Sequence, residues 1–202
     1  YSDNGSTAVE VALKAALQYN YNKGIKKTKI IAFEEAFHGD TFGAMASSGI
    51  SFFTEAFQGS LLQVDRIPVP TTGNEEKSIF ELKRLLATND YAAFLFEPLV
   101  LGAAGMVMYE PEALDKLIAI CNDNHVFTIA DEVMTGFGRT GKMFASEYMN
   151  TEPDIMCFSK GLTAGAMPMG LTSCAQPIYD AFYDDNKEKT FFHGHSFTGN
   201  PL

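Results

Sequence analysis

Short apolar runs rich in Val, Ile and Phe alternate along this chain with segments that have the periodicity of helices. Continuous apolar runs are typical of strands buried on both faces, and their alternation with helices is typical of β-α units around a parallel sheet. The sequence therefore predicts an α/β fold with a mostly parallel central sheet and helices on both faces. The expected strands lie at residues 29–33, 61–64, 92–96, 126–130, 155–158 and 170–174.

Helical spacing is clearest at residues 111–122, where apolar side chains recur at i, i+3, i+4 and i+7 and a proline stands in the first turn. Residues 75–86 predict a second amphipathic helix. Each of the two segments has one apolar face, which we expect to pack against the sheet.

A further helix, expected over residues 8–17, is almost entirely apolar. Its polar side chains Glu10 and Lys14 and the following Gln18 lie four residues apart and form one narrow stripe. Glu10 and Lys14 stand in the order that favours an ion pair on a helix. The pattern predicts a helix that is packed on nearly all sides.

Composition limits the classes of partner. The 202 residues are 46% hydrophobic and 20% charged, which is enough apolar material for one compact domain. The formal charge is −10 and the pI is near 4.8. Nucleic-acid-binding proteins gain affinity when Lys and Arg release counterions from phosphates, so we expect no nucleic-acid partner. No apolar stretch has the length or flanks of a membrane span or a leader peptide, and we expect neither.

The three cysteines, Cys121, Cys157 and Cys174, are odd in number, lack C-x-x-C spacing and fall within apolar runs. This pattern predicts buried thiols in a reducing compartment, and therefore a cytoplasmic protein. The chain begins at Tyr1 and stops after Gly199-Asn-Pro, where a helix is expected to start. We therefore expect it to be the middle of a longer protein.

Lys160 ends the apolar stretch that contains residues 155–158 and is followed at once by glycine. An amine at the end of a buried strand is expected to be poorly solvated and nucleophilic toward aldehydes. The segment therefore predicts a lysine that forms a Schiff base.

Asp131 follows the apolar run 126–130, so its carboxylate is expected at the carboxyl end of a strand, where open α/β sheets bind their ligands. A carboxylate in that place can hold a proton on a ring nitrogen. It can equally make the hydrogen bonds of an ordinary turn, and the residue alone does not decide between the two roles.

The segment Asn4-Gly-Ser-Thr-Ala-Val-Glu10 leads into the apolar helix. Its glycine and hydroxyl residues leave backbone N–H groups free at the positive end of the helix dipole, where a phosphate would bind. A capping box made by Thr7 and Glu10 is the commoner explanation of such a segment. Both interpretations stay open on these residues alone.

The segment Gly136-Phe-Gly-Arg-Thr-Gly-Lys142 matches two nucleotide-binding patterns incompletely. Its G-x-G-x-x-G match is not followed by a long helical pattern, and its G-x-x-x-x-G-K match continues with Met143, where magnesium binding requires Ser or Thr. We therefore expect a Gly-rich loop near the site, with Arg139 available to contact an anionic group of a substrate.

Four ring side chains complete the candidates. His193 and His195, with His38, have the residue type of metal ligands but no convincing spacing for a third ligand, so we expect no metal. Phe37 lies at a turn between an expected strand and an expected helix, where an aromatic ring either stacks on a flat ligand or joins the core.

Together these segments resemble the class III, fold-type I aminotransferases, which use pyridoxal phosphate. The matches occur in the family's order, and Lys160 follows Asp131 by 29 residues (160 − 131), as in that family. Residues 5–14 and 193–202 are most similar to the members that transfer an amino group from S-adenosyl-L-methionine to 8-amino-7-oxononanoate, giving 7,8-diaminononanoate for biotin. The matching segments are Asp3-Asn-Gly-Ser-Thr-Ala-Val-Glu10, Phe37-His-Gly-Asp40, Glu97-Pro, Ala130-Asp-Glu-Val133 with Thr135-Gly-Phe-Gly-Arg-Thr-Gly141, Ser159-Lys-Gly161 and His193-Gly-His-Ser-Phe-Thr-Gly-Asn-Pro201.

The resemblance implies roles for individual residues. Lys160 is expected to form an imine with the aldehyde of pyridoxal phosphate, and to move the proton of the amino donor's α-carbon. Asp131 is expected to keep the pyridine nitrogen protonated. The backbone at Gly5 and Ser6 is expected to bind the phosphate, and Phe37 to cover the ring.

The resemblance also implies a homodimer. Gly194 is expected at the substrate, and His195 and Ser196 at the phosphate of the neighbouring subunit, so that two copies would share each active site. The chain departs from some relatives at two positions. Phe37 stands where the biotin-pathway members often have Tyr, and His195 where some relatives have Pro.

The resemblance spans residues 1–202 and corresponds to the family's large, cofactor-binding domain; the amino-terminal segment and the carboxyl-terminal small domain are expected outside this chain. Three alternatives remain. The first is another class III aminotransferase that uses ornithine, acetylornithine or an ω-amino acid as donor. The second is a catalytically idle protein of the same fold, against which the joint presence of Lys160 and Asp131 argues. The third is a nucleotide-binding domain based on residues 136–142.

Overall fold

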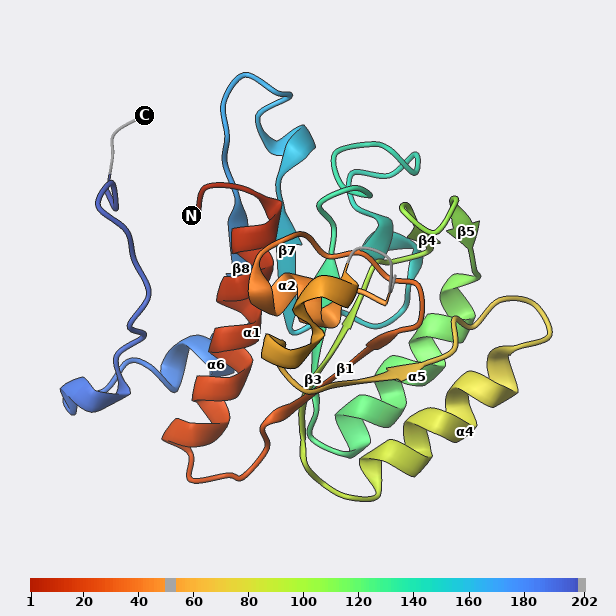
Figure 1. Ribbon diagram of the computed structural model, residues 1–202, viewed down its shortest axis with the longest axis horizontal. Coiled ribbons are helices and arrows are strands. Elements are labelled where there is room, and N and C mark those ends of the chain that lie inside the picture. Colours follow the sequence, from red (N-terminus) through yellow and green to blue (C-terminus); the bar gives the residue numbers. More distant parts are fainter. Residues whose placement is uncertain (50–53, 200–202) are drawn as a thin grey trace.

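Six strands pair into one sheet in the order β2-β1-β3-β6-β7-β8 (Figure 1). The computed structural model describes residues 1–49 and 54–199. All neighbouring strands are parallel except β7 and β8, and a separate antiparallel hairpin is formed by β4 and β5. The strands are β1 (Lys29–Phe33), β2 (Val64–Ile67), β3 (Tyr91–Phe96), β4 (Val100–Leu101), β5 (Val107–Met108), β6 (Phe127–Asp131), β7 (Ile155–Phe158) and β8 (Leu171–Cys174).

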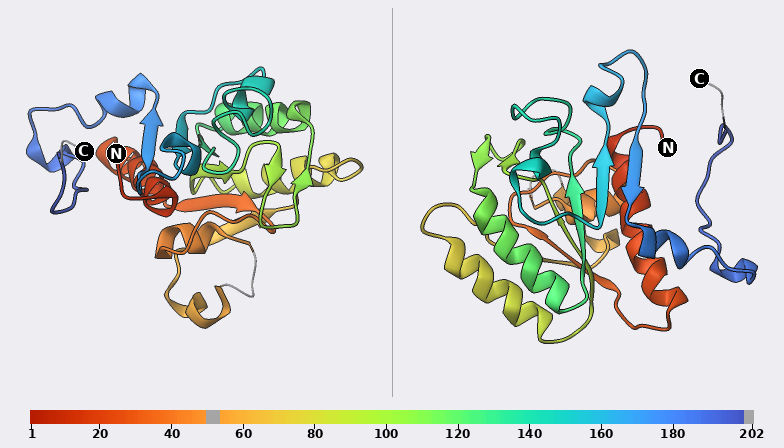
Figure 2. Two further views of the ribbon diagram at one scale, coloured as in Figure 1. Left: turned by 90° about the horizontal axis from the view of Figure 1, so that it is seen from above. Right: turned by 180° about the vertical axis from the view of Figure 1, so that it is seen from behind.

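Helices cover both faces of this sheet, as the sequence predicts (Figure 2). The amphipathic pair α4 (Glu75–Leu86) and α5 (Pro111–Asp123) lies on one face, and α1 (Gly5–Asn22) with α2 (Phe42–Ser47) lies on the other. Among the described helices, none is both long and apolar enough to cross a membrane. The remaining short elements are α6 (Gln176–Asp180), η1 (Glu55–Ser60), η2 (Ala145–Tyr148), η3 (Lys160–Leu162) and η4 (Lys187–Lys189).

Strand β3 shows why the apolar runs are continuous. All six of its residues are buried. Phe94 and Phe96 join the core cluster under α4 and α5, whereas Ala93 and Leu95 join the cluster under α1. Since successive side chains of a strand point to opposite faces, a sheet covered on both sides needs apolar residues at every position. Burying a Leu or Phe side chain contributes about 1.5–3 kcal/mol.

Helix α1 is packed on nearly all sides, which confirms the prediction from its composition. Its buried residues include Ala8, Val9, Ala12 and Leu13, and it contacts strands of the sheet together with α2 and α6. The alanines let the helix approach the sheet closely. The helix ends before Gly24, whose φ of 70° is a left-handed conformation that terminates helices.

The predicted ion pair between Glu10 and Lys14 is wrong. Glu10 Oε1 instead accepts hydrogen bonds from the backbone N–H groups of Gly43 (2.6 Å) and Ala44 (3.1 Å), at the amino end of α2. Lys14 Nζ donates to the carbonyl oxygen of Phe192. A carboxylate gains more from charge-assisted bonds to free N–H groups than from an exposed i, i+4 pair worth about 0.3–0.5 kcal/mol.

Strand β2 begins at Val64 and not at residue 61. It is an edge strand, and edge strands accept charged side chains such as Asp65 and Arg66 that hide them from a search for apolar runs. Arg66 is held in place because its guanidinium donates to the carbonyl oxygens of Ala46 and Ser48, each at 2.7 Å.

The prediction of three buried thiols holds for two of them. Cys121 and Cys157 are buried, and burial raises the pKa of both thiols. Cys174 is exposed, because it ends β8, which is the other edge strand. None of the three forms a disulfide.

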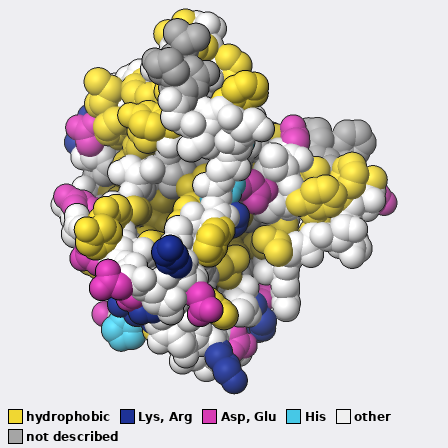
Figure 3. Space-filling view, turned by 90° about the vertical axis from the view of Figure 1, so that its left-hand side faces the viewer, with side chains coloured by type: hydrophobic (Ala, Val, Ile, Leu, Met, Phe, Trp, Pro, Cys, Tyr) yellow, Lys and Arg dark blue, Asp and Glu magenta, His cyan; other side chains and the backbone are white. Residues whose placement is uncertain are grey.

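Large apolar side chains remain exposed in the carboxyl-terminal segment, residues 179–199. Tyr179, Tyr183, Phe192 and Phe197 are each more than half exposed. Figure 3 shows the side of the molecule on which this segment lies, with several groups of apolar side chains on its surface.

Candidate active site

The carboxyl ends of the central strands and the amino end of α1 enclose a pocket of about 500 Å³. This is the edge of the sheet at which open α/β folds bind ligands. The pocket brings together five of the predicted site residues, which come from segments far apart in the sequence. They are Gly5, Ser6, Phe37, Asp131 and Lys160.

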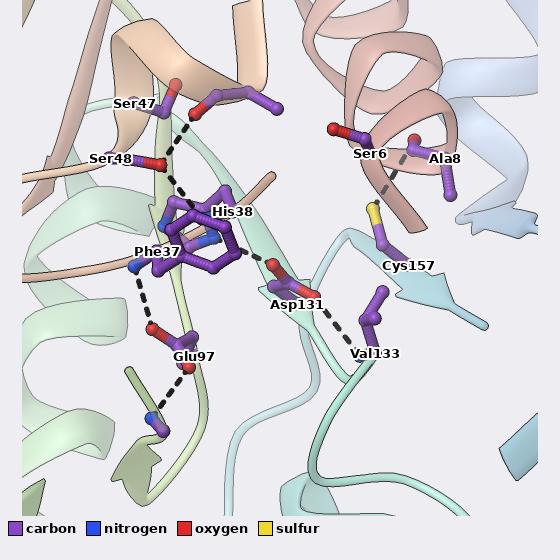
Figure 4. Close-up of polar contacts among 12 residues, drawn as sticks. Ser6, Ala8, Phe37, His38, Ser47, Ser48, Glu97, Asp131, Val133 and Cys157 are labelled. Carbon is purple, nitrogen blue, oxygen red and sulfur yellow. Dashed lines mark hydrogen bonds and ion pairs between the residues drawn. The ribbon is translucent and has the colours of Figure 1, made fainter. Parts of the chain in front are cut away.

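Asp131 is the last residue of β6, and its side chain is almost completely buried. Its Oδ2 lies 2.7 Å from Nδ1 of His38, and its Oδ1 accepts the backbone N–H of Val133 at 3.1 Å (Figure 4). The turn role weighed from the sequence is therefore present, and the carboxylate also lines the pocket, while its role toward a ring nitrogen stays a prediction. The two bonds leave Asp131 with a fixed orientation.

The sequence indicates His38 only as a possible metal ligand, and the structure places it at the pocket beside Asp131. Its side chain is fully buried, and its Nε2 has no hydrogen-bond partner among the described residues. Its backbone N–H donates to Ser48 Oγ at 3.0 Å. An unsatisfied buried polar atom is rare and marks a place where a functional explanation is needed. The signal in the sequence was the position of His38 just after a strand, at the same sheet edge as Asp131.

Glu97 holds the loop that carries Phe37. Its Oε1 accepts the backbone N–H of Phe37 and its Oε2 accepts that of Gly102, both at 3.0 Å. Burial raises the pKa of Glu97 above its ordinary value, against the opposing effects of His38 and of these two N–H groups. The side chain therefore ties two loops of the pocket wall together (Figure 4).

The amino end of α1 has a capping box, but not the predicted one. Asn4 Oδ1 accepts the backbone N–H of Thr7 at 3.0 Å, and Thr7 Oγ1 accepts that of Asn4 at 2.9 Å. The pairing of Thr7 with Glu10 is therefore wrong. The N–H groups of Gly5 and Ser6 have no acceptor within residues 1–49 and 54–199 and lie at the pocket. The free N–H groups at a helix amino end favour an anion.

Two glycines allow segments of the pocket wall to approach each other closely. A Cβ atom on Gly5 would lie 2.7 Å from Cγ1 of Val133, so only glycine lets α1 approach the loop after β6. Gly39 has a φ of 125°, and a Cβ there would meet the Ser6 hydroxyl at 2.0 Å. That hydroxyl instead accepts the backbone N–H of Thr41 at 3.2 Å.

Lys160 starts the short helix η3, two positions beyond the end of β7. Its φ of 43° is left-handed, a conformation that costs a non-glycine residue about 1–2 kcal/mol and is concentrated at functional sites. The expected poor solvation of this amine is wrong, because Lys160 is exposed at the mouth of the pocket. The buried position at this end belongs to Ser159, whose hydroxyl donates to the Met169 carbonyl at 2.6 Å.

Arg139 does not line the pocket. Its Nε donates to the carbonyl oxygen of Met134 at 2.5 Å, and its loop is closed by the bond from Phe137 N–H to the Met143 carbonyl at 2.6 Å. Met134, which precedes the Gly-rich loop, lines the pocket, so the loop is adjacent to it. The Arg139 side chain is not among the pocket residues. The structure does not bring Arg139 to the other predicted substrate residues.

A buried carboxylate accepts hydrogen bonds from both ends of this loop. Glu132 is fully buried, and its Oε2 accepts the backbone N–H of Ala145 at 3.1 Å, while its Oε1 accepts that of Ser146 at 2.7 Å. The hydroxyls of Thr135 and Ser146 donate to the same carboxylate. Glu132 therefore holds both ends of the Gly-rich loop.

Replacing Glu132 with alanine should lower the free energy of unfolding by about 2–5 kcal/mol, because buried N–H groups would lose their acceptor. The matched control is Glu147→Ala, which removes an exposed carboxylate bonded to Phe144 N–H at 2.8 Å in the same loop. The control should cost about 1 kcal/mol or less. Urea unfolding of both variants of the full-length protein measures the difference, and equal losses would contradict the assignment.

Gly194, His195 and Ser196 are exposed and do not line this chain's pocket. His195 Nε2 lies 3.6 Å from Asp3 Oδ1, and the segment runs along the outside of the molecule (Figure 1). Their contact with a neighbouring subunit stays a prediction. Residues 200–202 of the same motif, and the helix expected there, lie outside the described residues. In the part of the chain that the structure describes, no group of three His, Cys, Asp or Glu could hold a metal ion.

The chain is similar in sequence to curated aminotransferases. The chain is 47% identical to the adenosylmethionine-8-amino-7-oxononanoate aminotransferase of Synechococcus elongatus and 43% identical to that of Geobacter sulfurreducens. Each match covers 100% of this chain, and 50% and 48% of the two relatives. The chain therefore spans about half the length of the curated relatives it matches.

Solved structures agree with the predicted fold. The enzyme of the same name from Methanocaldococcus jannaschii superposes with a TM-score of 0.88 at 34% identity, over 97% of this chain and 46% of that one. An amine transaminase from an uncultivated Pseudomonas species, in its PLP-bound form, gives 0.90 at 31% identity, over 97% and 48%. The family model for class-III aminotransferases matches residues 1–202. The α/β prediction is confirmed, and the chain belongs to the class-III aminotransferase family.

Proposed function

We propose that this chain is the cofactor-binding domain of a pyridoxal-phosphate-dependent aminotransferase. In this proposal the enzyme moves the amino group of S-adenosyl-L-methionine to 8-amino-7-oxononanoate and forms 7,8-diaminononanoate for biotin. The observation that carries the proposal is the pocket at which the Lys160 amine, the Asp131 carboxylate and the amino end of α1 meet. Family membership and the shared name of the relatives support the choice of substrates.

The residues of the pocket fit pyridoxal phosphate. A volume of about 500 Å³ is within the usual range for a small-molecule site. The unpaired N–H groups of Gly5 and Ser6 suit the phosphate, and the buried Asp131 carboxylate suits a protonated ring nitrogen. Phe37 lines the same pocket and offers an aromatic face to the ring.

The side chains divide the chemistry between them. When bound, the cofactor supplies an aldehyde that captures amines and a ring that accepts electrons. Lys160 Nζ would hold that aldehyde, and the same amine would move the proton of the donor's α-carbon. Asp131 would hold the proton on the ring nitrogen, and His38 would keep the carboxylate aimed at it.

A homodimer is part of the proposal. His195 and Ser196 would contact the cofactor phosphate of the neighbouring copy, and Gly194 would lie at the substrate. Phe192 and Phe197 flank these residues and are 70% and 73% exposed, so both rings are available for contact with a second copy. We place the enzyme in the cytoplasm, where its free thiols would stay reduced.

The amino donor is tested on the full-length protein loaded with pyridoxal phosphate. S-adenosyl-L-methionine is expected to change the visible absorbance of the bound cofactor at least about a hundredfold faster than ornithine, since a site built for one donor leaves polar groups unpaired with another. Formation of 7,8-diaminononanoate on adding the acceptor is the second measurement.

A response to ornithine or to an ω-amino acid alone would assign the chain to another class-III activity. That alternative has support of its own, because several solved structures of the same fold are amine or ω-transaminases. A protein that binds the cofactor but responds to no amine would support the idle-protein hypothesis instead.

A further inference from the structure

One face of α1 carries a polar stripe, which we define as Lys14, Gln18 and Asn22. The three side chains are four residues apart, so they lie one above another on the helix surface. Each is half-buried and not free in solvent. Something therefore packs along this face of the helix.

The partner of the stripe is the backbone of residues 181–192. Every donor of the stripe reaches a carbonyl oxygen, so these bonds depend on the path of that backbone. Side chains on a rigid helix can in this way fix an irregular segment. The bonds run from Lys14 Nζ to Phe192 (3.1 Å), from Gln18 Nε2 to Thr190 (2.8 Å), and from Asn22 Nδ2 to Lys189 (3.0 Å) and Ala181 (3.1 Å).

Lys14 contacts three consecutive residues of this segment. Besides its bond to Phe192, its Nζ lies 5.7 Å from the ring centre of Phe191 and 3.1 Å from Nδ1 of His193. The ring of Phe191 also packs edge to face on Phe182, with ring centres 5.3 Å apart. The Lys14 ammonium group therefore makes the largest number of contacts between the stripe and residues 191–193.

In the described parts of the chain, the stripe makes no hydrogen bond to any residue between His193 and Gly199. The following residues, Gly194 to Ser196, are exposed, and the ion pair of His195 is with Asp3, which precedes the helix. Lys14 is therefore the last contact with α1 before the chain reaches these residues, and it sets the point from which they extend.

We propose that Lys14, supported by Gln18 and Asn22, is a positioning residue for phosphate binding across the dimer. This inference rests on the proposed function. Helix α1 presents its amino end to the phosphate in its own pocket and its stripe to the segment that would serve the neighbouring copy. One rigid helix would thereby set the geometry of two phosphate contacts.

The test uses the full-length protein and the variant Lys14→Met, which keeps the length of the side chain and removes the ammonium. Amide hydrogen exchange of residues 189–193 should become about tenfold faster, and the dissociation constant of pyridoxal phosphate should rise about tenfold, as expected for the loss of a charged hydrogen bond. The control is Lys26→Met, an exposed lysine without a hydrogen bond or ion pair in the described parts of the chain. It should change neither quantity.

Two further variants separate positioning from general loss of structure. Lys14→Arg should restore most of the cofactor affinity, because arginine also donates to a carbonyl oxygen. Gln18→Glu sets a carboxylate against the Thr190 carbonyl and should repeat the effect of Lys14→Met at a second site of the stripe.

The decisive comparison is made in a Ser196→Ala background, where the effect of Lys14→Met on cofactor affinity should shrink to less than threefold, because both changes act on the same contact. An equal effect with and without Ser196, or no effect in either protein, would overturn the positioning role. Failure of the unaltered protein to bind pyridoxal phosphate would instead overturn the proposed function, and the two results are distinguishable.

Discussion

Replacing Lys160 with alanine is expected to lower the turnover number of the full-length enzyme by about 10⁴-fold or more. A positioned proton-transfer group contributes roughly 10²–10⁴, and this variant also loses the amine that would hold the cofactor aldehyde. No second lysine lines the pocket in the described parts of the chain, so no other amine can take its place. Fold and phosphate binding should persist, because Lys160 is exposed and contributes no buried contact.

The measurement pairs steady-state rates with the visible spectrum of the bound cofactor. The matched control is Lys142→Ala, which removes a lysine of the neighbouring loop whose Nζ donates to the Glu147 carbonyl at 2.6 Å outside the pocket. It should retain turnover within about threefold, as surface substitutions usually do. Turnover that survives in Lys160→Ala would refute the proposed chemistry, whatever the control shows.

The sequence predicted the central strands well because their signal is local. Strands β1 and β7 have the predicted bounds, β3 begins one residue earlier than predicted, and β6 is shifted by one residue at both ends. These strands lie in a sheet that helices cover on both faces, so most of their residues are apolar. At the edge strand β2 only one side is shielded by a neighbouring strand, and its charged residues shifted the prediction.

The sequence predicted the location of two site residues because both lie at the carboxyl ends of strands. Asp131 ends β6 and Lys160 lies just beyond the end of β7, and the carboxyl ends of parallel strands meet at one edge of the sheet, so their joint presence in a pocket follows from the topology. Their local environments did not follow. The solvation of Lys160 depends on whether the turn after β7 points into the core or out of it.

Contacts between distant segments could not be predicted from the sequence. His38 and Asp131 are 93 residues apart, and their bond requires β1, β3 and β6 to lie side by side. Glu10 likewise bonds to Gly43, 33 residues away, although a nearby lysine offered a local partner. Helix spacing predicts pairs between residues that are close in the sequence. Tertiary packing can bring a stronger hydrogen-bond partner from a distant segment, and the side chain then bonds to that partner.

Replacing Asp131 with asparagine is expected to lower turnover by about 10²–10³-fold, because an aimed charge in a buried site stabilises charge that develops during the reaction. The amide has nearly the same size and can still accept the Val133 N–H, so the fold should be retained. It carries no negative charge to hold a proton on the ring nitrogen. The cofactor should therefore still bind through its phosphate, with an altered absorbance and slow exchange of the donor's α-proton.

The control for this variant is Asp154→Asn, at the amino end of β7 and thus at the opposite edge of the sheet. Asp154 accepts the backbone N–H and the hydroxyl of Thr128, each at 2.8 Å, so its loss should cost about 1–2 kcal/mol of stability and leave turnover unchanged. If His38 acts through Asp131, then His38→Gln should slow the enzyme in the normal background and add less than threefold to Asp131→Asn. Independent, multiplying effects would mean that the imidazole has a role apart from orienting the carboxylate, and the 2.7 Å bond would then be structural.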